Sequence, residues 1–432
     1  MTTVDESEAL AADALRWLRN TARDTGDGGL GWPVAPSDGA VEPTLYNGTA
    51  GVVPVLLEAW RHFGDDSYAD TALRAARSLA DAVDEHPDAS LYFGLTGIAV
   101  VLRAVHRDLG SAAAGAAADR ALARVRARFD GTRWGDLFEL MGGNAGIGLG
   151  ALLCGDADGA LAALEPYSRT AEPTAAGVTW PWLAGAGTRL HHLAHGTLGI
   201  AYALAVVGTA TGREDLVGLS RAGVADVVSR DEAGSQGFLV PHSDPQHRPD
   251  VVDRHSYGWC HGPAGDAQVF RMLRDVLGES SWSDLADRCW HTVTRSGLPR
   301  RLRPGFWDNN GRCCGTAGVL ALAGDRIAEQ GDSPEFAAAL VADLASRATR
   351  DASGARWRNV EHRAATSDLE AQTGWAMGNA GIARELLRHV RLSRGGDPRY
   401  AFTWPDQPAV RVTTAQTTEP IRPADGGGDV TS

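Results

Sequence analysis

Three cysteines and two histidines stand at matched places in the chain. Each lies one or two residues ahead of a glycine pair of the form G-x-x-G, which an apolar run follows. They are His195 in AHGTLG, Cys260 and His261 in CHGPAG, and Cys313 and Cys314 in CCGTAG. Three thiols in one place form a soft ligand set, which favours a tetrahedral Zn²⁺ with its fourth position open. Because imidazole titrates near neutral pH, His195 is a candidate general acid or base, and His261 is a competing metal ligand.

The glycine pattern occurs seven times along the chain. The first glycines stand at positions 48, 94, 143, 196, 262, 315 and 378, each opening an apolar helix that a more polar helix follows. Repeats of this length suit helical hairpins, and glycines three apart let another backbone come close. We therefore expect an all-α protein with one domain over residues 1–403. It would be an α/α toroid of seven hairpins with inner and outer helix rings; the alternative is an open α-solenoid.

In such a ring, the residues ahead of each glycine pair converge on one mouth. Two places before the first glycine stand Tyr46, Tyr92, Met141, Ala194, Cys260, Cys313 and Ala376. Directly before it stand Asn47, Phe93, Gly142, His195, His261, Cys314 and Met377. Only repeats four, five and six carry His or Cys there, which predicts metal or nucleophile chemistry in three successive hairpins. We expect the remaining thiols, Cys154 and Cys289, to be buried packing residues.

Further candidates flank these positions. Glu139 lies four residues before Gly143 and Asp136 seven before it, and either carboxylate could orient an imidazole or a substrate. Trp259, beside the first cysteine, could form a wall of the site, whereas His191 and His192 are expected to be capping or core residues.

Composition excludes several classes of function. The net charge of −13 argues against nucleic-acid binding, and the absence of lysine excludes Schiff-base chemistry. Five scattered cysteines do not make a disulfide framework, and no membrane span is expected. The acidic, amphipathic N-terminus predicts a helix over residues 5–22 and a cytoplasmic protein. Residues 404–432 are polar and rich in Pro, Gly and Thr, which predicts a flexible tail.

From about residue 45 to residue 387 the chain resembles the LanC lanthionine cyclases and LanC-like proteins. The resemblance rests on the seven G-x-x-G repeats and on the LAHG, WCHG and CCG motifs in that order. It implies an α/α toroid with Zn²⁺ at its mouth. It also implies a cyclase that closes thioether rings in a dehydrated, ribosomally made precursor peptide. A dehydratase or other modifying enzymes are the expected partners.

The resemblance also carries residue assignments. Cys260, Cys313 and Cys314 would bind zinc in a three-cysteine variant of the site, whose last motif in many members is Cys-His-Gly. The histidine of LAHG is His195, and the family's aspartate corresponds to Glu139. Where the cyclases have an arginine four residues before the zinc cysteine, this chain has Ser256, with Arg254 two residues earlier; His261 replaces their tyrosine. Trp259, His261 and Arg254 are therefore the expected substrate-binding residues.

Three alternatives remain at this point. A LanC-like protein could add glutathione or another small thiol to dehydrated residues, or a zinc toroid could act as a non-catalytic scaffold in a modifying complex. An α/α-toroid glycosidase would require two opposing carboxylates, and Glu139 and Asp136 lie on one short segment.

Overall fold

The computed structural model of the protein describes residues 2–26, 28–300, 309–359 and 369–405. Fourteen helices lie in this part of the chain. They are α1 Val4–Thr21, α2 Thr49–Phe63, α3 Asp66–Ala82, α4 Leu95–Leu109, α5 Ala112–Ala127, α6 Asn144–Leu153, α7 Ala157–Thr170, α8 Thr197–Thr211, α9 Glu214–Val228, α10 Pro263–Leu277, α11 Ser281–Arg295, α12 Thr316–Gln330, α13 Glu335–Arg347 and α14 Asn379–Ser393.

Short antiparallel strand pairs connect some of these helices. They are β1 Arg23–Asp24 with β2 Leu30–Gly31, β3 Glu172–Pro173 with β4 Val178–Thr179, β5 Arg189–Leu190 with β6 Ser243–Asp244, and β7 Thr349–Asp351 with β8 Gly354–Arg356.

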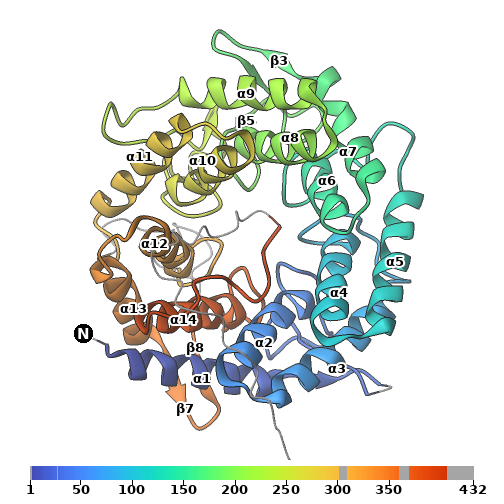
Figure 1. Cartoon of the computed structure of the whole chain (residues 1–432), viewed down its shortest axis with the longest axis vertical. Helices are drawn as coiled ribbons and strands as arrows, with labels where there is room; N and C mark the ends of the chain where they lie inside the picture. Colours follow the sequence, from blue (N-terminus) through green and yellow to red (C-terminus); the bar gives the residue numbers. More distant parts are fainter. Residues whose placement is uncertain (1, 27, 301–308, 360–368, 406–432) are drawn as a thin grey trace, which may run out of the picture.

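The helices form two concentric rings (Figure 1). The inner ring consists of α2, α4, α6, α8, α10, α12 and α14, and each member packs against the next, including α14 against α2. In a solenoid the last repeat would not contact the first. The closed circle confirms the predicted α/α toroid and excludes the open solenoid.

Helix α1 supplies the outer helix of the seventh hairpin. It packs along α14 and buries Leu10 and Leu18. Ion pairs also join the N-terminal end of α1 to the C-terminal end of α14. Arg394 donates to Glu8 at 2.6 Å and to Asp5 at 2.9 Å. The helix predicted over residues 5–22 is confirmed, and its position beside the last repeat is what closes the outer ring.

The second glycine of each repeat permits a close approach at the start of the inner helix. A Cβ at Gly97 would lie 1.9 Å from the Leu91 carbonyl oxygen, and one at Gly265 would lie 1.8 Å from that of Trp259. The predicted close approach of another backbone at these glycines is confirmed. The backbone that comes close is the segment that leads into the same helix, which folds back over the first helical turn.

The last described residues cross the ring beneath its mouth. Trp404 is 1% exposed, stacks on Trp375 with ring centroids 4.3 Å apart, and donates from Nε1 to the Tyr92 hydroxyl at 2.8 Å. The Pro405 carbonyl accepts a hydrogen bond from Tyr202. The folded part therefore extends to at least Pro405, beyond the expected boundary at residue 403. Residues 406–432, the rest of the expected tail, lie outside the described residues.

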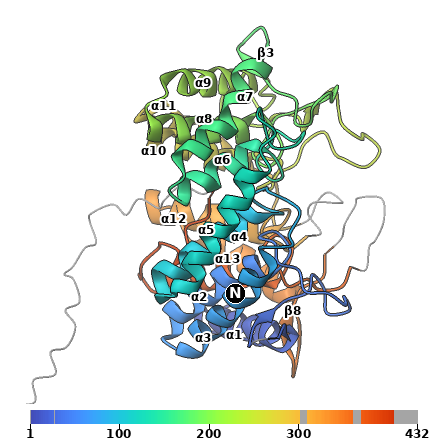
Figure 2. The ribbon, with the colours of Figure 1, turned by 90° about the vertical axis from the view of Figure 1, so that its right-hand side faces the viewer.

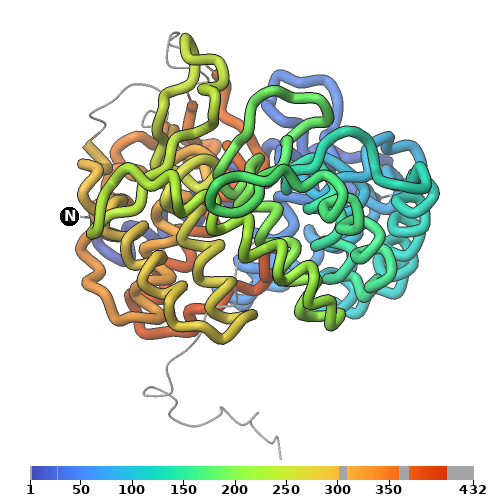
Figure 3. The backbone as a smooth tube through the Cα atoms, turned by 90° about the horizontal axis from the view of Figure 1, so that it is seen from above, coloured from blue at the N-terminus to red at the C-terminus, as the bar shows by residue number. Residues whose placement is uncertain are grey.

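One face of the toroid carries the segments that lead into the inner helices. Figure 2 shows the long connecting segments gathered on one side of the ring, and Figure 3 shows them rising from that face. Every inner helix begins directly after the first glycine of its repeat, so seven helix N-termini surround this mouth. Among the described helices, none has both the length and the apolar character needed to cross a membrane.

Replacing Gly97 by alanine tests the close approach. The added methyl would overlap the Leu91 carbonyl, and overpacking of this kind costs about 1–3 kcal/mol of unfolding free energy. Gly218 on α9 is the control, because a Cβ there meets nothing within 4 Å. Gly218→Ala should leave stability unchanged or raise it by up to about 1 kcal/mol, as measured by urea unfolding. Equal stabilities for the two variants would contradict this explanation of the repeat.

Candidate metal centre

A circular series of backbone hydrogen bonds surrounds the mouth. Its members, which we call the mouth belt, are the residues two places before the first glycines: Tyr46, Tyr92, Met141, Ala194, Cys260, Cys313 and Ala376. In five of the seven steps the N–H of one member donates to the carbonyl of the next repeat's member, at 2.8 to 3.1 Å. From Met141 the N–H donates instead to Glu139 Oε2 at 2.6 Å. The remaining step runs from Cys260 to Cys313, whose thiol groups lie close together.

The three predicted thiols converge. The Sγ atoms of Cys260, Cys313 and Cys314 all lie within 4.8 Å of one another, with 3.0 Å between Cys260 and Cys314 and 3.4 Å between Cys314 and Cys313. These distances exceed the roughly 2.05 Å of a disulfide, and all three cysteines are free. Within the described residues this is the one group of three or more His, Cys, Asp or Glu side chains close enough to hold a metal ion.

The donor set fits a zinc ion. Zinc–thiolate bonds of about 2.3 Å in a tetrahedron place sulfurs about 3.8 Å apart, which small side-chain adjustments from the observed spacing would give. Cys260 and Cys313 are buried and Cys314 is partly exposed, so the cluster has one side toward the mouth. Three protein ligands leave a fourth position for another group, an arrangement typical of a catalytic zinc site.

Glu139 and His195 form an acid–imidazole pair. The Nδ1 atom of His195 lies 3.0 Å from Glu139 Oε2, and the carboxylate also accepts the N–H groups of Met141 and Gly142 at 2.6 and 2.7 Å. Glu139 is 2% exposed, whereas the His195 side chain is 35% exposed. The buried carboxylate therefore fixes an imidazole that solvent or substrate can reach.

The pKa of His195 is set by two opposing effects. Burial disfavours the imidazolium, but the charge of Glu139 and the hydrogen bond to it outweigh that effect and raise the pKa above its ordinary value. The contact with Glu139 occupies Nδ1 and leaves Nε2 to exchange a proton. His195 is thus suited to both general-base and general-acid chemistry near neutral pH.

The alternative acid lies elsewhere. Asp136 pairs with Arg133 at 2.8 Å, and its side chain is 68% exposed. Of the two carboxylates weighed from the sequence, Glu139 is the one that contacts His195. The two acids therefore have different partners, Arg133 for Asp136 and His195 for Glu139.

The other histidines of the mouth pack together. The ring of His261 stacks on that of His195 with centroids 5.4 Å apart. Its centroid lies 4.2 Å from that of the His242 ring. Burial and the surrounding histidines lower the pKa of His261 well below its usual range and that of His242 to about 3, so both rings are neutral. His261 lies outside the group of convergent ligand atoms. No motif in the sequence pointed to His242.

His192 is fixed by a buried carboxylate. Its Nδ1 lies 2.8 Å from Asp266, and both side chains are fully buried. Asp266 directly follows the second glycine of the fifth repeat, so this pair joins the segment before α8 to the start of α10. The expected core position of His192 agrees with this contact, which the sequence did not reveal.

Two of the expected substrate-binding residues have partners within the protein. Trp259 is 1% exposed. Its ring packs beneath the mouth against the rings of Tyr92 and Trp375, with centroid distances of 6.0 and 5.3 Å. It is therefore a packing residue and not a substrate-facing wall. Arg254 pairs with Glu232 and lines a cavity of about 270 Å³ together with His191.

Tyr46 belongs to the centre although its position looked unreactive in the sequence. Its hydroxyl lies 3.4 Å from Cys313 Sγ. Only closure of the ring brings the first repeat beside the sixth, so no local signal could have identified this contact.

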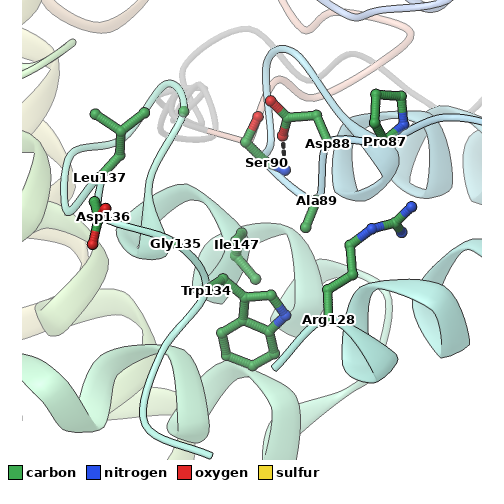
Figure 4. A pocket seen from close by; sticks show the side chains of 11 residues that line it. Pro87, Asp88, Ala89, Ser90, Arg128, Trp134, Gly135, Asp136, Leu137 and Ile147 are labelled. Carbon is green, nitrogen blue, oxygen red and sulfur yellow. Dashed lines mark hydrogen bonds between the residues drawn. The ribbon is translucent and has the colours of Figure 1, made fainter. Parts of the chain in front are cut away.

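A larger cavity, of about 400 Å³, opens beside Glu139 (Figure 4). Leu137 and Gly142, which flank Glu139 in the sequence, both line it, and Trp134 forms part of its wall. Arg128 extends into this cavity and donates to the His86 carbonyl at 2.6 Å. Asp136 also lines this cavity, whereas neither Glu139 nor His195 is among its lining residues.

Glu139→Gln should lower the pKa of His195. The variant removes the negative charge that favours the imidazolium, so the ring will lose its proton at a lower pH than in the wild type. NMR titration of the ring resonances measures this pKa, with His195→Gln providing the assignment. Asp136→Asn, a charge-matched change on the same segment, should leave the pKa unaltered; a shift as large as that of Glu139→Gln would refute the pairing.

The chain is similar to a known protein family and to several solved structures. The profile of the family described as "Lanthionine synthetase C-like protein" matches residues 39–250 and 246–341. Among solved structures, "Nisin cyclase" is similar with a TM-score of 0.63 and 16% identity, over 93% of this chain and 96% of that one. The structure titled "Crystal structure of unsaturated glucuronyl hydrolase specific for heparin" is similar with a TM-score of 0.51 and 12% identity, over 92% and 100%.

At these identities the structural likeness shows the fold alone, which cyclases and sugar-processing enzymes share. No curated protein sequence matches the chain. The family profile, in contrast, spans well over half of the 432 residues. The chain belongs to the lanthionine synthetase C-like family.

Proposed function

We propose that this protein is a zinc-dependent lanthionine synthetase. It would add cysteine thiols of a ribosomally made peptide to dehydroalanine or dehydrobutyrine residues of the same peptide and so form thioether rings. The observation that carries the proposal is the convergence of three free thiols at the mouth of a LanC-like toroid that also holds the Glu139–His195 pair. The substrate would come from a dehydratase, since its electrophile is a dehydrated serine or threonine.

Cys260, Cys313 and Cys314 would hold the ion. When bound, zinc lowers the pKa of a coordinated thiol and so keeps a substrate cysteine deprotonated at neutral pH. Three thiolate ligands donate more charge than a mixed nitrogen and sulfur set, which favours a nucleophilic sulfur over a strong Lewis acid.

His195 would move the proton. Its Nε2 accepts the proton of the incoming thiol, the new S–C bond forms at the β-carbon, and the π electrons pass to the neighbouring carbonyl as an enolate. The imidazolium then returns a proton to the α-carbon, so no external acid or base is consumed. Glu139 holds the ring through Nδ1 and stabilises its charged form between the two transfers.

Binding both reacting groups in one mouth supplies a second contribution. Because addition of a thiolate to a dehydroamino acid is already facile, orientation accounts for a large share of the acceleration. The cavity of about 400 Å³ lined by Leu137 and Gly142, which flank Glu139 in the sequence, would offer room for other residues of the peptide.

Replacing each cysteine of the trio tests the proposal. Cys260→Ala, Cys313→Ala and Cys314→Ala should each reduce bound zinc from about one ion per chain and abolish ring closure. Zinc is measured by elemental analysis, and closure by mass spectrometry after thiol trapping of a co-expressed, dehydrated precursor. Cys154→Ala, a change to a thiol at the end of α6, should preserve both quantities.

Two outcomes would contradict the proposal. Full ring closure by a zinc-free variant would remove the metal from the mechanism. A wild-type protein that binds zinc but closes no ring in the dehydrated precursor would instead support the scaffold alternative.

A further inference from the structure

Ring closure places the tyrosine of the first repeat beside the cysteines of the sixth. The Tyr46 carbonyl accepts the N–H of Ala376 at 3.0 Å, and the Ala376 carbonyl accepts the N–H of Cys313 at 2.8 Å. Tyr46 and Cys313 are thus two steps apart in the mouth belt, although 267 residues separate them in the sequence. Their side chains meet at 3.4 Å, from the phenol oxygen to Sγ.

The tyrosine ring is held on its other side by aromatic residues. Its centroid lies 5.1 Å from that of Phe93 and 6.3 Å from that of Tyr92, with the second ring edge-on. Its N–H donates to the Tyr92 carbonyl at 2.9 Å. Backbone and ring are therefore both fixed, and the orientation of the hydroxyl toward the sulfur follows from packing.

We propose that Tyr46 is a positioning residue of the metal centre, donating a hydrogen bond from its hydroxyl to the metal-bound thiolate of Cys313. The inference rests on the proposed zinc site. A thiolate ligand carries no proton, so within the loaded site the phenol is the only possible donor of the pair. Hydrogen bonding to the charged form stabilises it, which should strengthen metal binding.

This bond would distinguish sulfurs that are otherwise chemically alike. With a substrate thiolate in the fourth position, four sulfurs would share one ion, and each is a possible nucleophile. The hydrogen bond withdraws electron density from Cys313, the ligand that Tyr46 contacts, and so leaves more of the reactivity to the substrate sulfur. Outer groups that hydrogen-bond to metal ligands commonly change metal affinity 10- to 100-fold.

Tyr46→Phe removes the hydroxyl and keeps the ring. In the cobalt-substituted protein, the sulfur-to-cobalt charge-transfer band should move to longer wavelength, because a sulfur without the hydrogen bond is a better electron donor. Zinc affinity, measured by competition with a chromophoric chelator, should fall about 10-fold or more. Tyr92→Phe is the matched control: its hydroxyl accepts from Trp404, and its removal should leave the cobalt band in place.

The outcomes separate this inference from the proposed function. If Tyr46→Phe matches the wild type in band position and binds zinc within twofold of it, the hydrogen bond is refuted while the zinc site stands. If the wild-type protein takes up neither cobalt nor zinc, the metal centre and this inference both fail. An equal band shift in Tyr92→Phe would show a general loosening of the mouth and would also overturn the specific contact.

Discussion

The mouth belt is the constraint on which the rest of the toroid depends. Helices can bury their apolar faces against one another in many ways. Buried backbone N–H and carbonyl groups, in contrast, each need a hydrogen-bond partner. Here successive repeats satisfy one another, and the glycine three residues into each repeat lets the belt segment lie directly on its own helix. Local close packing and circular closure are therefore two results of one backbone arrangement.

The candidate metal ligands and the acid–imidazole pair lie where this belt departs from its regular pattern. At the third repeat, the Glu139 carboxylate accepts hydrogen bonds from the N–H groups of Met141 and Gly142 and contacts Nδ1 of His195. Between the fifth and sixth repeats, thiols occupy the step from one member to the next. Both departures replace a backbone partner by a side chain that can bind a metal ion or a proton, and both face the same opening.

Much of this could be predicted from the sequence because it is periodic. Seven glycine pairs predict seven inner helices. Because Cys260, Cys313 and Cys314 stand at equivalent places in successive repeats, the sequence also predicts that their thiols lie close together. The remaining features depend on contacts between different repeats or with the segment that follows the last repeat. Tyr46 reaches Cys313 only through closure, Trp404 fills the ring from a segment that is polar overall, and Asp266 contacts His192 across two hairpins.

The pairing of α1 with α14 has a consequence for synthesis of the chain. Among the described helices, α1 precedes all the others in the chain and α14 follows all the others, so the apolar face of α1 stays without its native cover until residue 393 has left the ribosome. Contacts this far apart in sequence slow folding and leave intermediates with exposed apolar surface. Because the belt step from Ala376 to Tyr46 also needs the seventh repeat, the mouth reaches its final shape only after that repeat has been made.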